Sequence, residues 1–294
     1  MSGRGDIDFI TGTEVADRLG ALLERAAELK AGRPAAGAGA LAGRSVALIF
    51  EQPSTRTRVS FEVGIAELGG TPVVLRSDEL QLSRGESVGD VGRVMSRYVH
   101  AIAIRSGSHE RLTDLAAAAE VPVINMLTPE HHPCQALADL QTLRERFGSL
   151  AGLRVAFVGD GNNVARSLAL LGSRAGLEVV VCSPTGLELE PGVGAELVAD
   201  PREAVAGADA IYTDVWISMG DEDDVAKRAA LAPYRVDDAL LAQASDRAVV
   251  LHCLPAHPGE EITAEVLYGP RSAVLDQAEN RLHAQKALLE LLIG

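Results

Sequence analysis

The sequence predicts an α/β protein built from two doubly wound parallel sheets. Short apolar runs alternate with helical patterns along the whole chain, and this alternation is typical of βαβ units. The chain has 294 residues, which is long for one domain and comfortable for two. Hydrophobic residues make up 47% and aromatic residues only 3%, so we expect cores in which Ala, Leu and Val pack helices onto sheets.

The apolar runs fall into two series of expected strands. The first series covers residues 45–50, 71–75, 101–106 and 121–126. The second series covers residues 154–159, 178–183, 210–215, 248–253 and 273–277. Helical patterns such as RVSFEVGIAELG and VARSLALLGSRAG lie between the strands. The two series predict two sheets.

A helical pattern at residues 133–150 is the expected joint between the two domains, because glycines bracket the start of the second strand series. The last segment is a good helix former with Leu at helical spacing. We therefore expect a first domain at 1–147, a second domain at 148–277 and a final helix at 278–294.

Charge and cysteine content exclude several classes of protein. The chain has 41 acidic and 27 basic residues, whereas a nucleic-acid surface needs a basic patch. The cysteines, Cys134, Cys182 and Cys253, are odd in number and widely spaced, which argues against a disulfide framework and favours a reducing cytoplasm. No segment reaches the ~18 apolar residues of a membrane span, so we expect no membrane association.

One expected strand-to-helix turn, STRTR at 54–58, concentrates two arginines and three hydroxyls. Free N–H groups and the positive dipole at a helix start attract anions. Arg56 adds a planar fork that fits phosphate oxygens. A helix cap flanked by surface arginines would explain one hydroxyl but not the whole group. Because the glycines of a nucleotide P-loop are missing, the turn favours a small phosphorylated ligand.

A second candidate site opens the helix in HHPCQALADL. His132 precedes Pro133, which suits the first helical position, and Gln135 lies one turn further on. The helix dipole disfavours imidazolium, so a neutral His132 can donate a hydrogen bond to a developing carbonyl oxyanion. A histidine that only caps the helix is the plainer alternative.

The stretch AFVGDGNNVARSL matches a dinucleotide-binding turn only in part. Its first two glycines fit the G-x-G pattern, but Val164 replaces the third. The next strand ends without an acid for a ribose, so the pattern disfavours NAD. Asn162 and Asn163 instead offer amides that can hold a carboxylate.

Two later strands end in polar residues. Asp214 stands where parallel sheets bind ligands, and its carboxylate can hold an ammonium group. Cys253 lies between His252 and His257 and has three open interpretations. It is a nucleophile with a paired base, a zinc ligand, or a non-covalent substrate contact in the loop that begins at Leu254. Spacing alone does not choose among them.

Together these motifs resemble the ornithine carbamoyltransferase family. STRTR, QLSRGES, HPCQALADL, GDGNN, DVWISMG, HCLPAH and AENRLHAQKALL follow that family's order over nearly the whole chain. The resemblance implies a carbamoyl phosphate domain, an amino-acid domain, a final helix packed on the first domain, and a homotrimer with sites at subunit interfaces. It also implies direct carbamoyl transfer to the δ-amine of L-ornithine, as in arginine biosynthesis or citrulline breakdown, without a metal or organic cofactor.

The resemblance assigns site residues as well. For carbamoyl phosphate these are Ser54, Thr55, Arg56, Thr57, Gln81, Arg105, His132, Gln135, Cys253, Leu254 and Arg281, with Gln81 reaching the neighbouring subunit's site. For ornithine they are Asn163, Asp214, Ser218 and Met219. Catalysis is expected to depend on Arg56, Arg105, His132, Cys253 and Arg281.

Two residues depart from the family's pattern near the expected substrate loops. Pro258 replaces the arginine of HCLPAHRGEE, and Met126 replaces the glycine of NGLT. These changes leave lysine, putrescine or an ornithine analogue as alternative amines. A homologue that binds carbamoyl phosphate without turnover is the non-enzymatic alternative, and the intact site residues argue against it.

Overall fold

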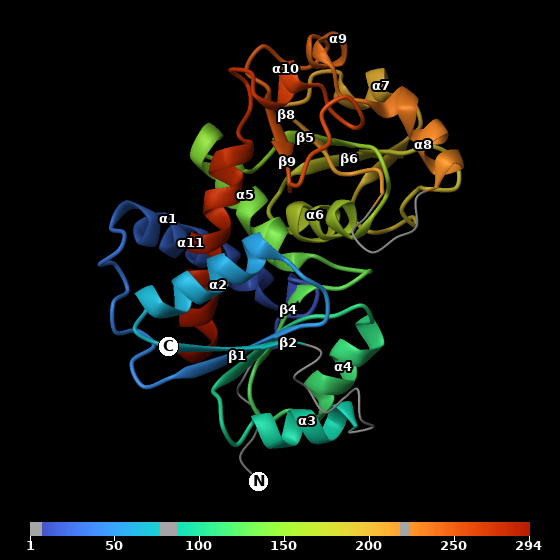
Figure 1. The fold of residues 1–294 in the computed structure, drawn as a ribbon. Helices are drawn as coiled ribbons and strands as arrows, with labels where there is room; N and C mark the ends of the chain where they lie inside the picture. The colour runs from blue at the N-terminus through green and yellow to red at the C-terminus, as the bar shows by residue number, and fades with distance from the viewer. Residues whose placement is uncertain (1–7, 77–86, 218–223) are drawn as a thin grey trace. The chain divides into compact units, whose positions relative to one another are not determined.

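The computed structural model describes residues 8–76, 87–217 and 224–294 (Figure 1). The chain divides into two compact units. Unit 1 comprises Met1–Gln141 and Asn280–Gly294, and unit 2 comprises Thr142–Glu279. Within the described residues unit 1 has a four-stranded sheet and unit 2 a five-stranded one, both parallel throughout. The predicted α/β fold with two parallel sheets is confirmed.

Unit 1 carries its sheet in the order β2-β1-β3-β4. The strands are β1 Ser45–Phe50, β2 Thr71–Arg76, β3 Ala101–Arg105 and β4 Val123–Leu127. The helices are the 3-10 helix η1 Thr13–Arg18, α1 Leu19–Ala31, α2 Thr55–Glu67, α3 Val88–Met95 and α4 His109–Ala118. Two further helices, α5 Pro133–Phe147 and α11 Val274–Ile293, each contribute residues to both units.

Helices cover both faces of the unit 1 sheet. Ala47 and Ile49 of β1 pack with Leu112 and Leu115 of α4 in one buried cluster. Helix α2 lies against the opposite face (Figure 1). The central strands therefore read as continuous apolar runs rather than as alternating ones, as expected for a parallel sheet buried on both sides.

The C-terminal part of α11 packs on α2 within unit 1, as predicted. Gly64 of α2 permits the close approach, because a Cβ there would meet Lys286 Cγ at 3.2 Å and Leu282 Cδ1 at 3.3 Å. The fully buried Lys286 donates a 2.9 Å hydrogen bond from Nζ to Glu67. Burial and ion pairing together hold the last helix on the first unit.

Unit 2 carries its sheet in the order β7-β6-β5-β8-β9. The strands are β5 Arg154–Val158, β6 Glu178–Cys182, β7 Glu196–Val198, β8 Ala210–Thr213 and β9 Val249–His252. The helices are α6 Asn163–Arg174, α7 Pro201–Val205, α8 Val225–Leu231, the 3-10 helix η3 Ala232–Tyr234, α9 Asp238–Leu241 and α10 Ala264–Leu267. Val158 of β5, Val180 of β6 and Ile211 of β8 share one buried cluster with side chains of α7, α9 and α10.

Two elements differ from the predicted set. The expected strand at 273–277 is wrong, because only Ser272 bridges to Val250 and helix α11 begins at Val274. Val274 and Gln277 are both buried, which is helical spacing. Strand β7 was not predicted, since it has only three residues at the sheet edge, one exposed and two partly buried.

Within residues 8–76, 87–217 and 224–294, no helix has the length and apolar character needed to cross a bilayer. Cys134, Cys182 and Cys253 are not joined in disulfides.

Candidate active site

The polar residues predicted for unit 1 gather where β1, β3 and β4 end and the next helices begin. Arg105 is the last residue of β3, and His132 stands directly before α5. Arg281 reaches them from α11. All three side chains are about 5% exposed. The carboxyl edge of a parallel sheet is where α/β folds bind ligands.

Arg281 links the starts of two helices through its guanidinium. One terminal nitrogen donates a 2.8 Å hydrogen bond to Thr57 Oγ1 of α2, and the other donates a 2.8 Å bond to Gln135 Oε1 of α5. Gln135 in turn donates from Nε2 to Asp139 Oδ1 at 2.8 Å. The network fixes both the orientation of the guanidinium and the rotamer of the amide. The structure thus brings together Thr57, Gln135 and Arg281, which the sequence had placed in one site.

His132 is held in its neutral form. Burial, followed by the positive charges of Arg281 and Arg105, lowers the pKa of His132 well below its usual 6.5. A neutral imidazole at this place can donate a hydrogen bond without carrying a charge of its own. The helix-start argument from the sequence reached the same protonation state, but the structure gives burial and the two arginines as the causes.

Cys134 is the second residue of the same helix and is fully buried. Its thiol donates a 3.4 Å hydrogen bond to the carbonyl oxygen of Asn125. Burial raises the pKa of Cys134 to about 12, and the charge of Arg281 offsets this only in part. A thiol with so high a pKa is not a nucleophile at neutral pH.

The two arginines of the STRTR turn, Arg56 and Arg58, have different surroundings. Ser54 precedes α2 in an extended conformation, and its side chain makes no capping hydrogen bond to the helix. Arg58 pairs with Glu62 at 3.0 Å along the helix surface. Arg56 is exposed and makes no ion pair with any residue that the structure describes. Arg58 therefore behaves as an ordinary surface arginine of a helix, and Arg56 does not share its ion pair.

Glu51 supports this edge of the sheet, and the sequence analysis missed it. Its carboxylate accepts hydrogen bonds from Ser106 Oγ at 2.8 Å and from the Gly107 N–H at 3.0 Å, and it pairs with Arg111 at 2.6 Å. The Glu51 N–H donates to the carbonyl oxygen of Arg105. Glu51 thus joins the loops that follow β1 and β3. An acid directly after an apolar strand was the signal that could have identified it.

The predicted residues of unit 2 centre on Asp214, which follows β8 and is 6% exposed. Its Oδ1 accepts a 2.8 Å hydrogen bond from the thiol of Cys253, and its Oδ2 accepts one of 2.8 Å from Asn162 Nδ2. Asn162 also caps α6, since its Oδ1 accepts from the N–H groups of Val164 and Ala165. Asn162 is thereby the amide that orients the carboxylate, while Asn163 begins the helix.

The second glycine of the GDGNN turn, Gly161, serves packing within unit 2. A Cβ on Gly161 would lie 2.5 Å from the Leu187 carbonyl oxygen and 2.7 Å from the Leu189 nitrogen. Only glycine permits that approach of two loops. This requirement explains the partial resemblance to a dinucleotide turn without a dinucleotide.

His252 has partners other than the neighbouring cysteine. Its Nε2 lies 3.2 Å from Glu261 Oε1, and its Nδ1 accepts a 2.9 Å hydrogen bond from the Leu254 N–H. Both ring nitrogens are therefore engaged, and the Cys253 thiol donates to Asp214. His252 is therefore not the paired base of a nucleophilic Cys253. The possible ligand atoms of Asp214, His252 and Cys253 do lie within 4.8 Å of one another.

The loop after β9 is held in a strained conformation. Leu254 has a φ of 59°, which is uncommon for a residue other than glycine. Burial pushes the pKa of Glu261 upward, but hydrogen bonds from His252 and from the His257 N–H outweigh it, so the pKa lies below its ordinary value. The ionised Glu261 fixes His252, and His252 fixes the Leu254 backbone.

The remaining predicted residues are distributed as follows. Thr55 is exposed at the start of α2. Met126 is fully buried within β4, and Pro258 forms an isolated bridge with Ile262. Gln81, Ser218 and Met219 lie outside the described residues.

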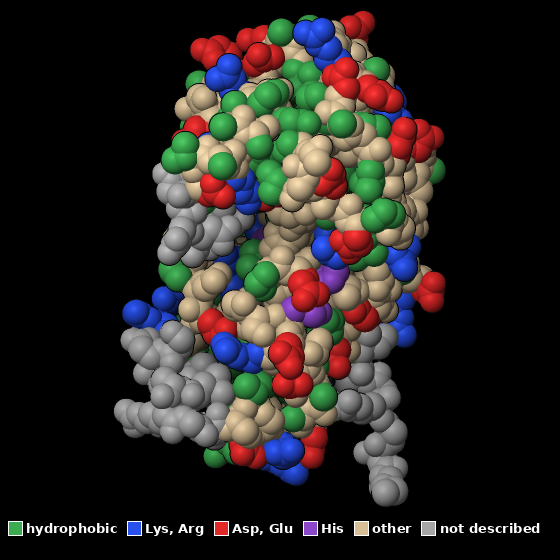
Figure 2. Space-filling view, turned by 90° about the vertical axis from the view of Figure 1, so that its right-hand side faces the viewer, with side chains coloured by type: hydrophobic (Ala, Val, Ile, Leu, Met, Phe, Trp, Pro, Cys, Tyr) green, Lys and Arg blue, Asp and Glu red, His purple; other side chains and the backbone are tan. Residues whose placement is uncertain are grey.

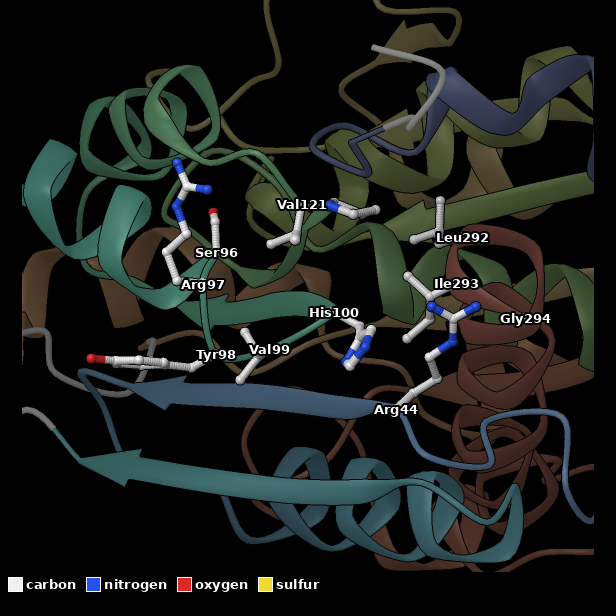
Figure 3. Close-up of a pocket in the computed structure, with 11 residues that line it drawn as sticks. Arg44, Ser96, Arg97, Tyr98, Val99, His100, Val121, Leu292, Ile293 and Gly294 are labelled. Atoms are coloured by element: carbon white, nitrogen blue, oxygen red, sulfur yellow. The ribbon is translucent and has the colours of Figure 1, made fainter. Parts of the chain in front are cut away.

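A separate pocket of about 480 Å³ lies at the opposite edge of the unit 1 sheet (Figure 3). Its lining includes Arg44, which directly precedes β1, and His100, which directly precedes β3. Figure 3 shows both side chains near the C-terminal residues Ile293 and Gly294. None of the predicted site residues lines this pocket.

Unit 1 has a helix start with arginines, and unit 2 has a carboxylate with neighbouring amides. Such groups are typical of an α/β transferase that binds two substrates. Residues 8–145 match the family model described as the carbamoyl-P binding domain of aspartate/ornithine carbamoyltransferase, and residues 151–292 match its Asp/Orn binding domain. The chain belongs to the aspartate/ornithine carbamoyltransferase family, which confirms the predicted resemblance.

Individual relatives extend the match over most of the chain. The ornithine carbamoyltransferase of Acidothermus cellulolyticus is 57% identical over 291 residues, which cover 93% of this chain and 92% of the relative. The solved ornithine carbamoyltransferase of Pyrococcus furiosus is 45% identical with a TM-score of 0.93 and covers 100% of this chain and 99% of its own. The one from Thermus thermophilus is 46% identical with a TM-score of 0.89, covering 95% and 96%.

Proposed function

We propose that this chain transfers the carbamoyl group of carbamoyl phosphate to the δ-amine of L-ornithine, forming L-citrulline and phosphate. The observation that carries the proposal is the buried Arg281, hydrogen-bonded to Thr57 and Gln135 beside a neutral His132. Fixed donors with little exposure to water are suited to stabilising charge that develops on a carbonyl oxygen.

Unit 1 takes carbamoyl phosphate in this proposal. The phosphate binds at the start of α2, where Ser54, Thr55, Arg56 and Thr57 supply donors. The carbamoyl group is oriented by Arg105, His132, Gln135 and Arg281. Exposed Arg56 supports the phosphate role, since it makes no ion pair with a described residue. Buried Arg105 and Arg281 support the carbonyl role, because charges in a site of low dielectric interact strongly.

Unit 2 takes ornithine in this proposal. Asp214 binds the α-ammonium and Asn163 binds the α-carboxylate. Cys253 and Leu254 place the δ-amine and also contact the carbamoyl group. Ser218 and Met219 complete the ornithine site from outside the described residues. The support is the placement of Asp214, which Asn162 and Cys253 hold by hydrogen bonds.

The chemical step is a direct transfer. The neutral δ-amine attacks the carbonyl carbon and forms a new C–N bond, while the carbonyl oxygen gains negative charge. Arg56, Arg105 and His132 stabilise that oxygen, with Arg281 contacting it. Collapse of the intermediate breaks the C–O bond to phosphate, and the attacking nitrogen loses a proton. Both substrates are bound before the step, so positioning supplies much of the rate.

The assembly and location are further parts of the proposal. We expect a homotrimer in which Gln81 contributes to the neighbouring subunit's site, and a cytoplasmic enzyme of arginine biosynthesis. The support is the resemblance of QLSRGES and the other motifs to those of the family.

A panel of amines tests the substrate assignment. We expect kcat/KM at saturating carbamoyl phosphate to rank ornithine first. Lysine keeps the head group but adds one methylene, which costs about 1–3 kcal/mol of discrimination in a tight pocket. Putrescine lacks the α-carboxylate and leaves the Asn163 amide without its partner, so it should be poor.

Two variants serve as controls for the panel. Met126→Gly restores the family residue inside β4 and should not change the ranking, because Met126 is buried there. Pro258→Arg restores the family residue in the loop after β9 and reports whether this loop sets amine choice. If lysine or putrescine matched ornithine, the substrate assignment would be wrong while carbamoyl transfer stood. Turnover with none of the amines would favour a non-catalytic homologue.

A further inference from the structure

A group of metal-ligating side chains in unit 1 lies outside the substrate roles assigned above. His109 is the first residue of α4, which follows β3. Glu130 and His131 lie in the loop that follows β4. Strands β3 and β4 are parallel neighbours, so their carboxyl ends bring these residues to the same edge of the sheet. Histidine side chains reach the surface next to acidic ones in Figure 2.

The distances in this group fit a shared ion. One candidate ligand atom from each of His109, Glu130 and His131 lies within 4.8 Å of the others. The two imidazole rings have centroids 5.2 Å apart and an interplanar angle of 57°. With metal–nitrogen bonds of about 2.1 Å and a tetrahedral angle, two imidazoles on one zinc ion have centroids roughly 5 Å apart. The rings therefore already stand at the spacing that ligation requires.

The buried Thr128 contacts the side chain of His109 and the backbone of His131. Thr128 Oγ1 lies 3.0 Å from His109 Nδ1 and accepts a 3.2 Å hydrogen bond from the His131 N–H. The Thr128 N–H donates a 2.9 Å bond to the His131 carbonyl oxygen. With Nδ1 of His109 engaged by the hydroxyl, Nε2 remains the nitrogen available to ligate an ion. Metal-binding histidines in proteins are commonly fixed in this way through the ring nitrogen that does not ligate.

The donor set selects the kind of ion. His131 is 8% exposed, His109 is half-buried and Glu130 is exposed, so an ion here would keep contact with water. Two imidazoles and a carboxylate suit zinc and similar transition metals, whereas magnesium and calcium prefer oxygen ligands. We propose that His109, Glu130 and His131 bind one divalent transition-metal ion of the zinc class, with water in the remaining position.

A bound ion would cross-link the loop between β4 and α5 to the start of α4. His131 directly precedes His132, and Thr128 begins the segment between β4 and that helix. A bound ion ties this segment to the start of α4 and stabilises the native state by mass action. None of the three ligand residues has a substrate role, so metal binding can be tested without the carbamoyl-transfer reaction.

Direct titration tests the site. The full chain, free of any histidine tag and stripped with a chelator, is titrated with Zn²⁺ in a calorimeter. We expect one ion per chain at this site. His109→Gln and His131→Gln should weaken binding by about a hundredfold or more, and Glu130→Gln by about tenfold. The matched control is His257→Gln, because His257, Glu260 and Glu261 form another such group, and it should bind like the parent chain.

Co²⁺ and thermal melting separate this site from the others. Cobalt bound to His109, Glu130 and His131 shows ligand-field bands without the near-ultraviolet charge-transfer band of a cobalt–thiolate bond. That thiolate band would place the ion with Cys253, Asp214 and His252 and overturn the proposal. Zn²⁺ should raise the melting temperature of the parent chain but not of His109→Gln.

Three other outcomes also overturn the proposal. They are no binding at micromolar ion, unchanged binding in His109→Gln, and loss of binding in His257→Gln. In the first case the two rings only pack against each other. Since His131 is buried, a poorly folded His131→Gln variant is set aside on its circular dichroism spectrum, and the half-buried His109 decides the result.

Discussion

The guanidinium of Arg281 donates a 2.8 Å hydrogen bond to the hydroxyl of Thr57, which stands 224 residues earlier in the chain. A second bond from the same group reaches Gln135. The last helix of the chain thereby sets the geometry at the start of α2 and of α5. The first prediction rests on that double contact.

Arg281→Lys should impair the use of carbamoyl phosphate. A lysine ammonium is a point charge and cannot reproduce two hydrogen bonds from one planar fork. Loss of a charged hydrogen bond is worth about 1.5–3 kcal/mol, so kcat/KM for carbamoyl phosphate should fall by about 10- to 150-fold. Steady-state kinetics check this, and Arg25→Lys, at a partly exposed pair with Glu290, is the matched control. Equal kinetics in the two variants would contradict the role of Arg281.

Arg56→Ala and Arg58→Ala should differ sharply although the residues are near neighbours in α2. Arg56 is assigned to the phosphate, whereas Arg58 pairs with Glu62 on the helix surface. Surface pairs of this kind contribute about 0.3–0.5 kcal/mol. Arg56→Ala should weaken carbamoyl phosphate binding by tenfold or more, and Arg58→Ala should leave it near the parent value. The two dissociation constants measure the contrast, and a similar loss in both variants would remove the phosphate assignment.

Cys253 should form no covalent intermediate. Its thiol donates to Asp214, and both nitrogens of His252 have other partners. We expect initial-rate patterns in which both substrates bind before product leaves, rather than ping-pong kinetics. Mass spectrometry of the enzyme with carbamoyl phosphate but no amine is the direct check. A carbamoylated Cys253 peptide in that sample would refute direct transfer.

The buried neutral His132 should lower the free energy of unfolding at acidic pH. Its folded-state pKa lies well below 6.5, so the unfolded chain takes up a proton at this histidine while the native chain does not. The free energy of unfolding therefore falls as the pH drops below about 6.5, by at most about 1.4 kcal/mol per pH unit. Above that pH the contribution does not change.

Urea unfolding at several pH values between 7 and 5 measures this effect. The parent chain should lose more stability over the range than His132→Gln, because the variant has no proton to take up. His132→Asn is a second variant that must agree with the first. Parallel stability curves for the parent and both variants would show that His132 is not held neutral.

The strand series and the motif positions were predictable because they depend on local pattern. β1 and β5 are apolar runs ending at polar turns, and each was placed within a residue of its observed end. The strand predicted at 273–277 was wrong because a few apolar residues fit a strand or a helix start equally well. Strand β7 was missed because three residues are too few to show an alternation of apolar and polar side chains.

The contacts of the site depend on tertiary structure and could not be predicted in the same way. Resemblance placed Thr57, Gln135 and Arg281 together, but no spacing indicates which atoms meet. Glu51 carries no family motif of its own, and its function is visible only in the bonds to Ser106, Gly107 and Arg111. Likewise, Asn162 rather than Asn163 contacts Asp214, a choice between adjacent identical residues that sequence cannot make.

Unit 1 is discontinuous in sequence, since its final piece is Asn280–Gly294 and all of unit 2 precedes it. During synthesis the ribosome therefore releases every residue of unit 2 before the last piece of unit 1. A nascent chain that stops short of this piece lacks Arg281 and leaves Glu67 without its partner Lys286. A translation product cut short by a stop codon before residue 281 therefore lacks the guanidinium that holds the starts of α2 and α5.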